Sequence, residues 1–159
     1  MSHYSIQTKL ALAVAGVGAL GAGTAIATAS PVHSARTQQI RLVEVERNST
    51  QLDLGAKGFS PGDRQTITSD LFTPSGRKAG RLDDDCAITQ AGSRPEALCS
   101  FVLTLHDGQL SGSFAQNLAA PDSGMRQAIT GGTGRYARAR GELRGGREGK
   151  RTPFAIRLG

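Results

Sequence analysis

The chain has 159 residues, of which 38% are hydrophobic and only 4% aromatic, and its formal net charge is +6. This length suits one folded domain rather than two, and the few aromatic residues exclude an interior that grips flat ligands between stacked rings. The positive charge would attract polyanions, but only Tyr136 and Phe154 lie among the clustered basic residues, and this argues against a specific nucleic-acid binder.

Residues 1–29 have the pattern of a secretory signal peptide. Lys9 supplies the positive charge, an uncharged run rich in Ala and Gly follows, and Ala27-Thr28-Ala29 forms a cleavage site. The alternative is a membrane anchor, because the run is about 20 residues long. Its Ala and Gly content favours cleavage, so we expect a secreted protein that is free of the membrane. The chain is expected to consist of a signal peptide (1–29), a flexible segment (30–39) and one domain (40–159).

Two cysteines, Cys86 and Cys99, lie in the exported part on either side of a turn cluster at 92–95. In an oxidising compartment this spacing predicts a disulfide that closes a loop of about 14 residues and contributes on the order of 3 kcal/mol. Two thiols alone do not fill a zinc shell, so we expect no metal there. The acidic run 83–85 is also a poor cation site, because consecutive strand residues point to opposite faces.

From residue 40 onwards the sequence reads as short strands separated by turns, such as Pro74–Gly76 and the Asp-Gly pair at 107–108. The predicted strands are Ile40–Arg47, Gln65–Thr73, Arg81–Gln90, Leu98–Leu105, Leu110–Phe114, Arg126–Thr130, Arg140–Arg147 and Thr152–Leu158. The pattern predicts an all-β domain, either a closed antiparallel barrel or a sandwich.

The glycine-rich stretch AITGGTGRYARARGEL spans residues 128–143. Its glycines, Gly131, Gly132 and Gly134, predict left-handed or otherwise restricted backbone positions in a structural loop. The stretch also satisfies G-x-G-x-x-A, a dinucleotide-binding pattern. That pattern must open a helix within a βαβ unit, and the glycines that follow would break a helix.

The stretch resembles the AITGGTGxYxxARGE signature of the allene oxide cyclase and dirigent barrel superfamily. The segment GFSPGDRQTITSDLFTPSGRKAG (58–80) is similar to a second stretch of that superfamily, in the same order along the chain. The likeness covers roughly 40–158. It implies an eight-stranded antiparallel β-barrel with an internal pocket that works without a cofactor.

No familiar catalytic constellation is present, which agrees with catalysis by positioning a reactive substrate in a shaped cavity. The resemblance aligns four polar pocket positions of the plant cyclases with Arg41, Val43, Ser69 and Cys86. Three of the four residue types differ here, and Cys86 is expected in a disulfide. The plant cyclisation is therefore not expected.

Alternation along the first two strands selects the residues expected to line the pocket. The candidates are Arg41, Val43 and Val45 on the first strand and Gln65, Ile67 and Ser69 on the second. Arg41 is the candidate for stabilising negative charge on a substrate. A shift of one residue would instead turn Glu44 and Glu46 inward.

Two functions remain open. The first is a cofactor-free isomerase, cyclase or guide of stereoselective coupling that binds a small hydrophobic metabolite. The second is a non-catalytic secreted module that contacts anionic cell-surface polymers through its basic face. A cavity with inward polar groups would favour the first, and a filled interior the second.

Overall fold

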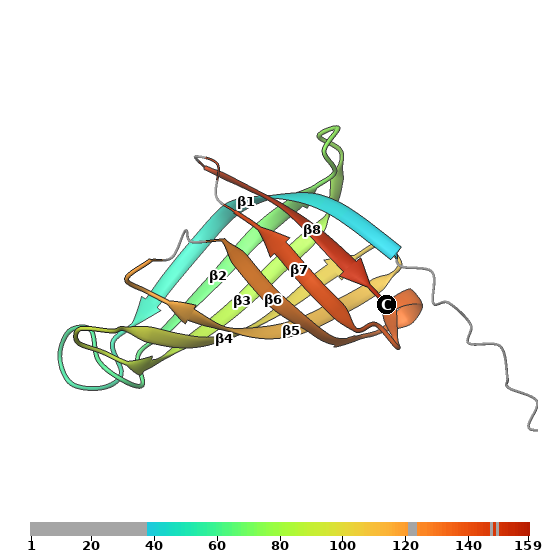
Figure 1. The fold of residues 1–159 in the computed structure, drawn as a ribbon. Coiled ribbons are helices and arrows are strands. Elements are labelled where there is room, and N and C mark those ends of the chain that lie inside the picture. The colour runs from blue at the N-terminus through green and yellow to red at the C-terminus, as the bar shows by residue number, and fades with distance from the viewer. Residues whose placement is uncertain (1–37, 121–123, 147, 149) are drawn as a thin grey trace, which may run out of the picture. The chain divides into compact units, whose positions relative to one another are not determined.

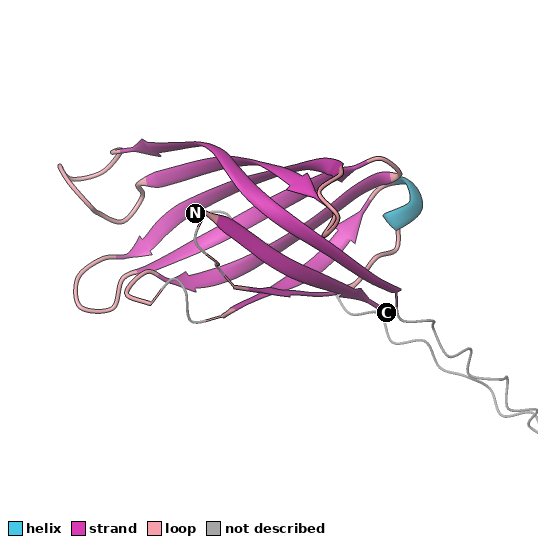
Figure 2. Ribbon diagram, turned by 90° about the horizontal axis from the view of Figure 1, so that it is seen from above, coloured by secondary structure: helices cyan, strands magenta, loops and turns pink. Residues whose placement is uncertain are grey.

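The residues that the structure describes form eight antiparallel strands and one short helix (Figures 1 and 2). The structure was obtained as a computed structural model that describes residues 38–120, 124–146, 148 and 150–159, so the expected signal peptide at 1–29 lies outside the described residues. The elements are β1 (Gln38–Leu52), β2 (Arg64–Phe72), β3 (Lys78–Gln90), β4 (Glu96–Leu105), β5 (Gly108–Asn117), β6 (Met125–Gly132), the 3-10 helix η1 (Gly134–Tyr136), β7 (Gly141–Gly145) and β8 (Arg151–Leu158).

The sheet closes on itself. Each strand pairs with the next in sequence, and β8 returns to pair with β1, with Gln38 opposite Leu158 and Val45 opposite Arg151. Closure satisfies the backbone hydrogen bonds that an open sheet leaves exposed at its edges. The predicted all-β barrel is therefore confirmed, and the alternative of a sandwich is excluded.

One end of the barrel is filled by apolar side chains. This end receives the start of β1, the end of β8, the turn between β4 and β5, and η1, which lies at the extremity of the ribbon in Figure 2. The side chains packed there include Leu42, Leu71, Leu82, Leu103, Leu110, Ile129, Tyr136, Ile156 and Leu158. We call this the closed end.

The glycine-rich stretch forms the loop that carries Tyr136 into the closed end. Gly134 has a positive φ of 58°, and a Cβ added to Gly132 would lie 2.3 Å from the backbone oxygen of Gln109. These two glycines occupy the restricted positions that the sequence predicts. Gly131 does not, because an added Cβ would meet no atom closer than 3.6 Å and its φ is not positive. The prediction of a restricted backbone is therefore wrong for Gly131.

The opposite end carries the longer loops, including the connection 53–63 between β1 and β2. Asp63 anchors this connection by accepting hydrogen bonds from the backbone amides of Leu54, Gly55 and Ser60 at 2.7–3.2 Å. These amides, with Leu54 contributing most, hold the pKa of Asp63 below its usual value. The aspartate therefore orders a loop beside the open end of the barrel.

Candidate functional site

A cavity of about 490 Å³ occupies the barrel between the apolar closed end and the open end. Its apolar wall includes Ile67, Leu82, Phe114, Leu143 and Phe154. Its polar wall includes Glu44, Glu46, Gln65, Asp84, Gln116, Gln127 and Thr152. This size matches that of small-molecule sites in proteins, and both apolar surface and polar groups are present to orient a ligand.

The side of β1 that faces the cavity is opposite to the predicted side. Arg41 is exposed, and neither Val43 nor Val45 belongs to the cavity wall, whereas Glu44 and Glu46 do. The three predicted positions are therefore wrong, and the alternative register holds. Leu42 is 3% exposed and belongs to the closed end, so strand alternation places Glu44 and Glu46 on the inner face above it.

The second strand faces the cavity with the predicted side. Gln65 and Ile67 lie in the cavity wall. Ser69 is fully buried beneath the cavity, and its hydroxyl donates a 2.8 Å hydrogen bond to Oε1 of Glu44. Ser69 therefore fixes the carboxyl group of Glu44 on the cavity floor instead of facing a ligand itself.

Asp84 is an acid of the cavity wall whose pKa is strongly shifted. It lies on β3 opposite Ile67, next to Phe101 in the β4 register, and its side chain is partly buried. Burial raises the pKa of Asp84 to about 7, and the negative charges of Glu44 and Asp83 add to the shift. Near neutral pH this carboxyl can therefore both hold and release a proton.

Sequence reasoning missed Asp84 because three aspartates in a row resemble a solvated surface run. In the structure, Asp83 and Asp85 point outward and bind Arg81 and Arg64. Strand alternation could have identified Asp84, because residues 82, 84 and 86 share one face of the strand. The predicted disulfide places Cys86 on the inner face, so Asp84 would have been predicted to point inward as well.

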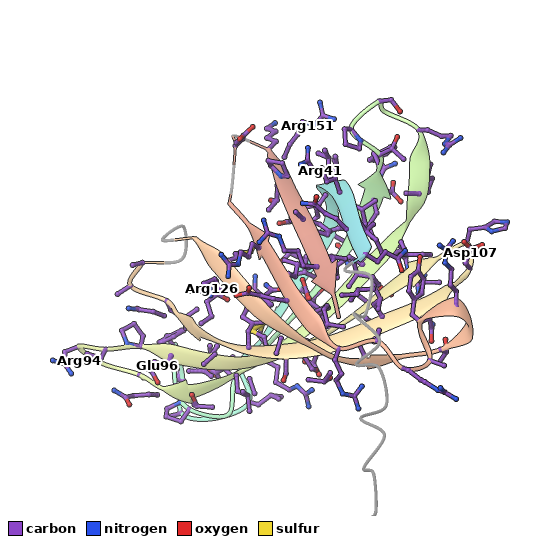
Figure 3. The ribbon with its side chains drawn as sticks, turned by 45° about the vertical axis from the view of Figure 1, so that its right-hand side comes forward. Arg41, Arg94, Glu96, Asp107, Arg126 and Arg151 are labelled. Carbon is purple, nitrogen blue, oxygen red and sulfur yellow. A yellow bond between two sulfur atoms is a disulfide. The ribbon has the colours of Figure 1, made fainter. Side chains whose placement is uncertain are left out.

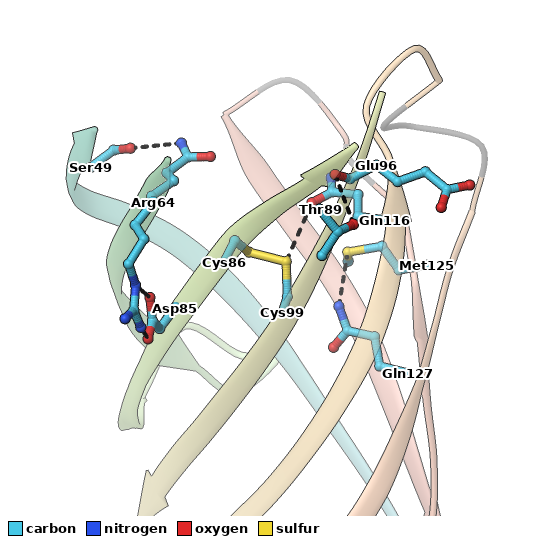
Figure 4. The surroundings of a disulfide bond; sticks show 11 residues. Ser49, Arg64, Asp85, Cys86, Thr89, Glu96, Cys99, Gln116, Met125 and Gln127 are labelled. Carbon is cyan, nitrogen blue, oxygen red and sulfur yellow. Dashed lines mark hydrogen bonds and ion pairs between the residues drawn. A yellow bond between two sulfur atoms is a disulfide. The ribbon is translucent and has the colours of Figure 1, made fainter. Parts of the chain in front are cut away.

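The predicted disulfide is present. Cys86 and Cys99 are opposite each other in the β3–β4 register and are joined by a bond, so no free cysteine occurs among the described residues. Figure 4 shows the bond between these strands near Gln116, Met125 and Gln127. Cys86 belongs to the cavity wall, so the disulfide fixes one side of the cavity.

Within the described ranges, no group of three or more His, Cys, Asp or Glu side chains could hold a metal ion. The same residues also contain no helix with the length and apolar character needed to cross a membrane.

A family profile described as the allene oxide cyclase barrel-like domain matches residues 43–152, which is more than half of the chain. The chain belongs to this family. Among curated proteins, none matches this allene oxide cyclase barrel-like chain.

Solved structures share the barrel. A pyocyanin demethylase superposes with a TM-score of 0.68 and 23% identity, covering 77% of this chain and 100% of that one. AbnU, an exo-specific intermolecular Diels-Alderase, gives a TM-score of 0.63 and 14% identity over 77% of this chain and 97% of its own. The Diels-Alderase AbmU from Streptomyces koyangensis superposes with a TM-score of 0.63 and 21% identity, covering 76% of this chain and 64% of that one. At these identities the likeness establishes the fold of the allene oxide cyclase barrel-like domain and not its reaction.

Proposed function

We propose that this allene oxide cyclase barrel-like protein is an enzyme that isomerises or cyclises a small, mainly apolar metabolite inside the barrel. The observation that carries the proposal is the carboxyl group of Asp84 in the wall of a cavity large enough for such a molecule. Related barrels that act on small molecules support the class of ligand.

Asp84 is the group assigned to the chemistry. Its ionised carboxylate takes a proton from one atom of the substrate and, after exchange with water, returns a proton to a different atom, either across a shifted double bond or after ring closure. The proton count is balanced, and no electrons leave the substrate, so the step needs no cofactor. A carboxyl whose pKa is near 7 suits this exchange, because both protonation states are populated at neutral pH.

Other cavity groups position the substrate. Glu44, whose carboxyl accepts a hydrogen bond from Ser69, orients polar groups of the substrate beside Asp84. The side chains of Phe114 and Phe154 supply apolar surface. Most of the rate enhancement would then come from holding the reacting atoms together, supplemented by one proton-transfer group.

The test is proton exchange in D₂O with a panel of small unsaturated ketones and amines, followed by NMR. We expect the protein to introduce deuterium at carbon, and Asp84→Asn to lower the rate about 100-fold or more. The matched control is Asp85→Asn, which alters the next carboxyl along β3 on the outer face and should keep the rate. Equal rates for the wild type and Asp84→Asn would contradict the role of Asp84.

We also propose that the protein is exported. The signal-like segment 1–29 supports this location, and so does a disulfide, since such bonds persist in oxidising compartments. Mass spectrometry of culture supernatant would test it, with a chain beginning near Ser30 as the expected product.

A second candidate function follows from the outer face of β6, β7, β8 and β1. Arginines project there from neighbouring strands, and Figure 3 labels three of them. They are Arg41, Arg126, Arg144, Arg151 and Arg157. Glu142 binds Arg126 and Arg144, whereas the other three form no ion pair within the part of the chain that the structure describes. This face would suit an acidic polysaccharide, since guanidinium groups pair well with carboxylates.

This second function predicts retention on alginate-agarose at low salt. Replacing Arg41, Arg151 and Arg157 with Gln should lower the salt concentration of elution substantially, because free guanidinium groups are lost from one face. The matched control removes three exposed charges elsewhere, through Lys57→Gln, Arg77→Gln and Arg94→Gln. If both triple variants elute together, net charge alone explains the retention, and the arginine face is not a binding site.

A further inference from the structure

Among the glutamines of the cavity wall, Gln127 on β6 is the most deeply buried. It is 8% exposed, whereas Gln65 and Gln116 are half-buried. Its surroundings in the sheet are apolar, because Leu143 lies opposite it on β7 and the next inward residue of its own strand is Ile129. A buried amide loses its hydrogen bonds to water and costs free energy unless new partners replace them. The partners of this amide therefore decide what Gln127 does in the cavity.

Within the described part of the chain, the hydrogen bonds of this amide are incomplete. Nε2 of Gln127 donates to Sδ of Met125 over 3.7 Å (Figure 4), and a thioether sulfur is a weak acceptor. The amide nitrogen carries two hydrogens, so one N–H remains, and no described residue donates to the amide oxygen. Since no buried side-chain nitrogen or oxygen of the described residues lacks a partner, this oxygen must reach the cavity. The amide is thus prepared to bind a polar group of a ligand.

The strand registers place Gln127 close to the row of Asp84. Across the sheet, Asp84 is paired with Phe101 of β4. Phe101 is paired in turn with Gly112 of β5, and Gly112 with Ile129 of β6. Gln127 is the next inward residue of β6 from this row, toward the open end. The carboxyl and the amide therefore line the cavity from β3 and β6, with β4 and β5 between them, and one small ligand can contact both.

The two groups have complementary uses in proton transfer at carbon. When a base removes a proton from carbon, the electron pair left behind needs an acceptor, and a neighbouring carbonyl group provides one. The negative charge then develops on the carbonyl oxygen, where an N–H donor in a site that excludes water stabilises it. Asp84 supplies the base, and the remaining N–H of Gln127 supplies the donor.

We propose that the ligand of the cavity is a small unsaturated ketone whose carbonyl oxygen accepts a hydrogen bond from Nε2 of Gln127 while Asp84 removes a proton from the neighbouring carbon. The inference rests on the proposed function, because it names the substrate class of that site. The C–H bond breaks, its proton goes to the carboxylate, and its electron pair forms a double bond to the carbonyl carbon as the C=O pair moves to oxygen. A proton then returns from Asp84 to a carbon further along the conjugated system, which restores the carbonyl, so nothing is oxidised or reduced.

The experiment compares two probes of matched shape with the whole purified protein. They are 2-tetralone, an enolisable ketone, and tetralin, the same bicyclic skeleton without oxygen. Calorimetry measures their affinities, and infrared spectroscopy follows the carbonyl band of 2-tetralone labelled with carbon-13 at that position. At pH 8 Asp84 is mainly ionised, so its own O–H is not the donor. We expect the band of the bound ketone at lower frequency than in hexane, and an unshifted band would overturn the inference.

Variants assign the hydrogen bond to one residue. Gln127→Leu and Gln127→Met both remove the amide at similar size. Each should weaken 2-tetralone about 5-fold, return the carbonyl band to its position in hexane and slow deuterium uptake beside the carbonyl about 10-fold or more. Neither should weaken tetralin, whose binding reports an intact cavity and so identifies a variant that does not fold. The matched control is Gln109→Leu, the same change at an exposed amide outside the cavity wall, which should alter none of these quantities.

The outcomes separate the two proposals. If the folded variants of Gln127 keep the affinity and the carbonyl band of the wild type, the inference is overturned while the cavity stands as a binding site. If the band depends on Gln127 but the protein introduces no deuterium, carbonyl recognition is supported and the proposed function fails. If neither probe binds at the limit of its solubility, both proposals fail.

Discussion

Asp84 has a cost in folding as well as a use in the site. Its folded-state pKa of about 7 lies above the ordinary value of 3.8, so the folded protein binds a proton that the unfolded chain has already lost between these pH values. Stability therefore falls as the pH rises from about 4 to about 7, and the full cost is present above pH 7. Such a cost is typical of residues kept for function rather than for stability.

Replacing this carboxyl should stabilise the protein in a pH-dependent way. The linkage sets an upper limit of about 4 kcal/mol at pH 8, and relaxation around the group reduces it. We expect Asp84→Asn to increase the free energy of unfolding by roughly 1–3 kcal/mol at pH 8 and by much less at pH 4. Urea denaturation at the two pH values measures this free energy of unfolding, with Asp85→Asn as the control variant. Equal stabilities at pH 8 would show that Asp84 is solvated like a surface carboxyl.

At individual positions, the sequence determined the two faces of a strand but not which face points inward. Counting apolar residues favoured the face of Arg41, Val43 and Val45, since the other face holds two glutamates. The glutamates are inside because the cavity is lined by polar groups and Ser69 donates to Glu44. A hydrogen bond from a neighbouring strand is invisible in the alternation of one strand.

Among the elements, the glycine-rich loop 131–134 has the clearest structural demand. It seals the closed end, and at Gly132 even a methyl group would lie 2.3 Å from one backbone oxygen and 2.6 Å from another, that of Tyr136. The backbone of Gln109 is held in the paired strand β5 and that of Tyr136 in η1, so neither oxygen can move aside cheaply. The loop therefore needs glycine for space at one position and for a positive φ at another, Gly134.

A pair of substitutions separates this demand from a general effect of glycine. Gly132→Ala should lower the free energy of unfolding by about 2 kcal/mol or more, because the backbone around it must shift. Gly131→Ala should change it by about 0.5 kcal/mol or less, since the nearest atom would be 3.6 Å away. Urea denaturation compares the two. A Gly132→Ala protein as stable as the wild type would mean that the loop is not tightly packed.

The strands themselves were predictable in number and order, because turn residues separate short alternating runs. The first strand is longer than predicted, ending at Leu52 rather than Arg47. Its pairing with β2 shifts between Glu46 and Asn48, so a bulge at Arg47 reverses the alternation midway. A period-two pattern cannot be followed through such a reversal, and the polar residues beyond it resemble a loop.

For the whole molecule, net charge hides a separation between inside and outside. The arginines lie on the outer face of β6, β7, β8 and β1, and the acidic side chains of Glu44, Glu46 and Asp84 line the cavity. The amino-acid composition gives only the net charge, which adds the charges of the outer face and of the cavity together. Closure was likewise suggested by the family resemblance, while the strand pattern alone also allowed a sandwich.

The pairing of Gln38 with Leu158 puts both ends of the described barrel at the closed end, as far as the fold allows from the mouth of the cavity. A protein tethered through a linker after Gly159 would therefore stand with its mouth turned away from the support. Surface-immobilised protein should capture ligands from solution as well as free protein does. The same geometry makes this end the natural place to fuse a fluorescent reporter without obstructing entry.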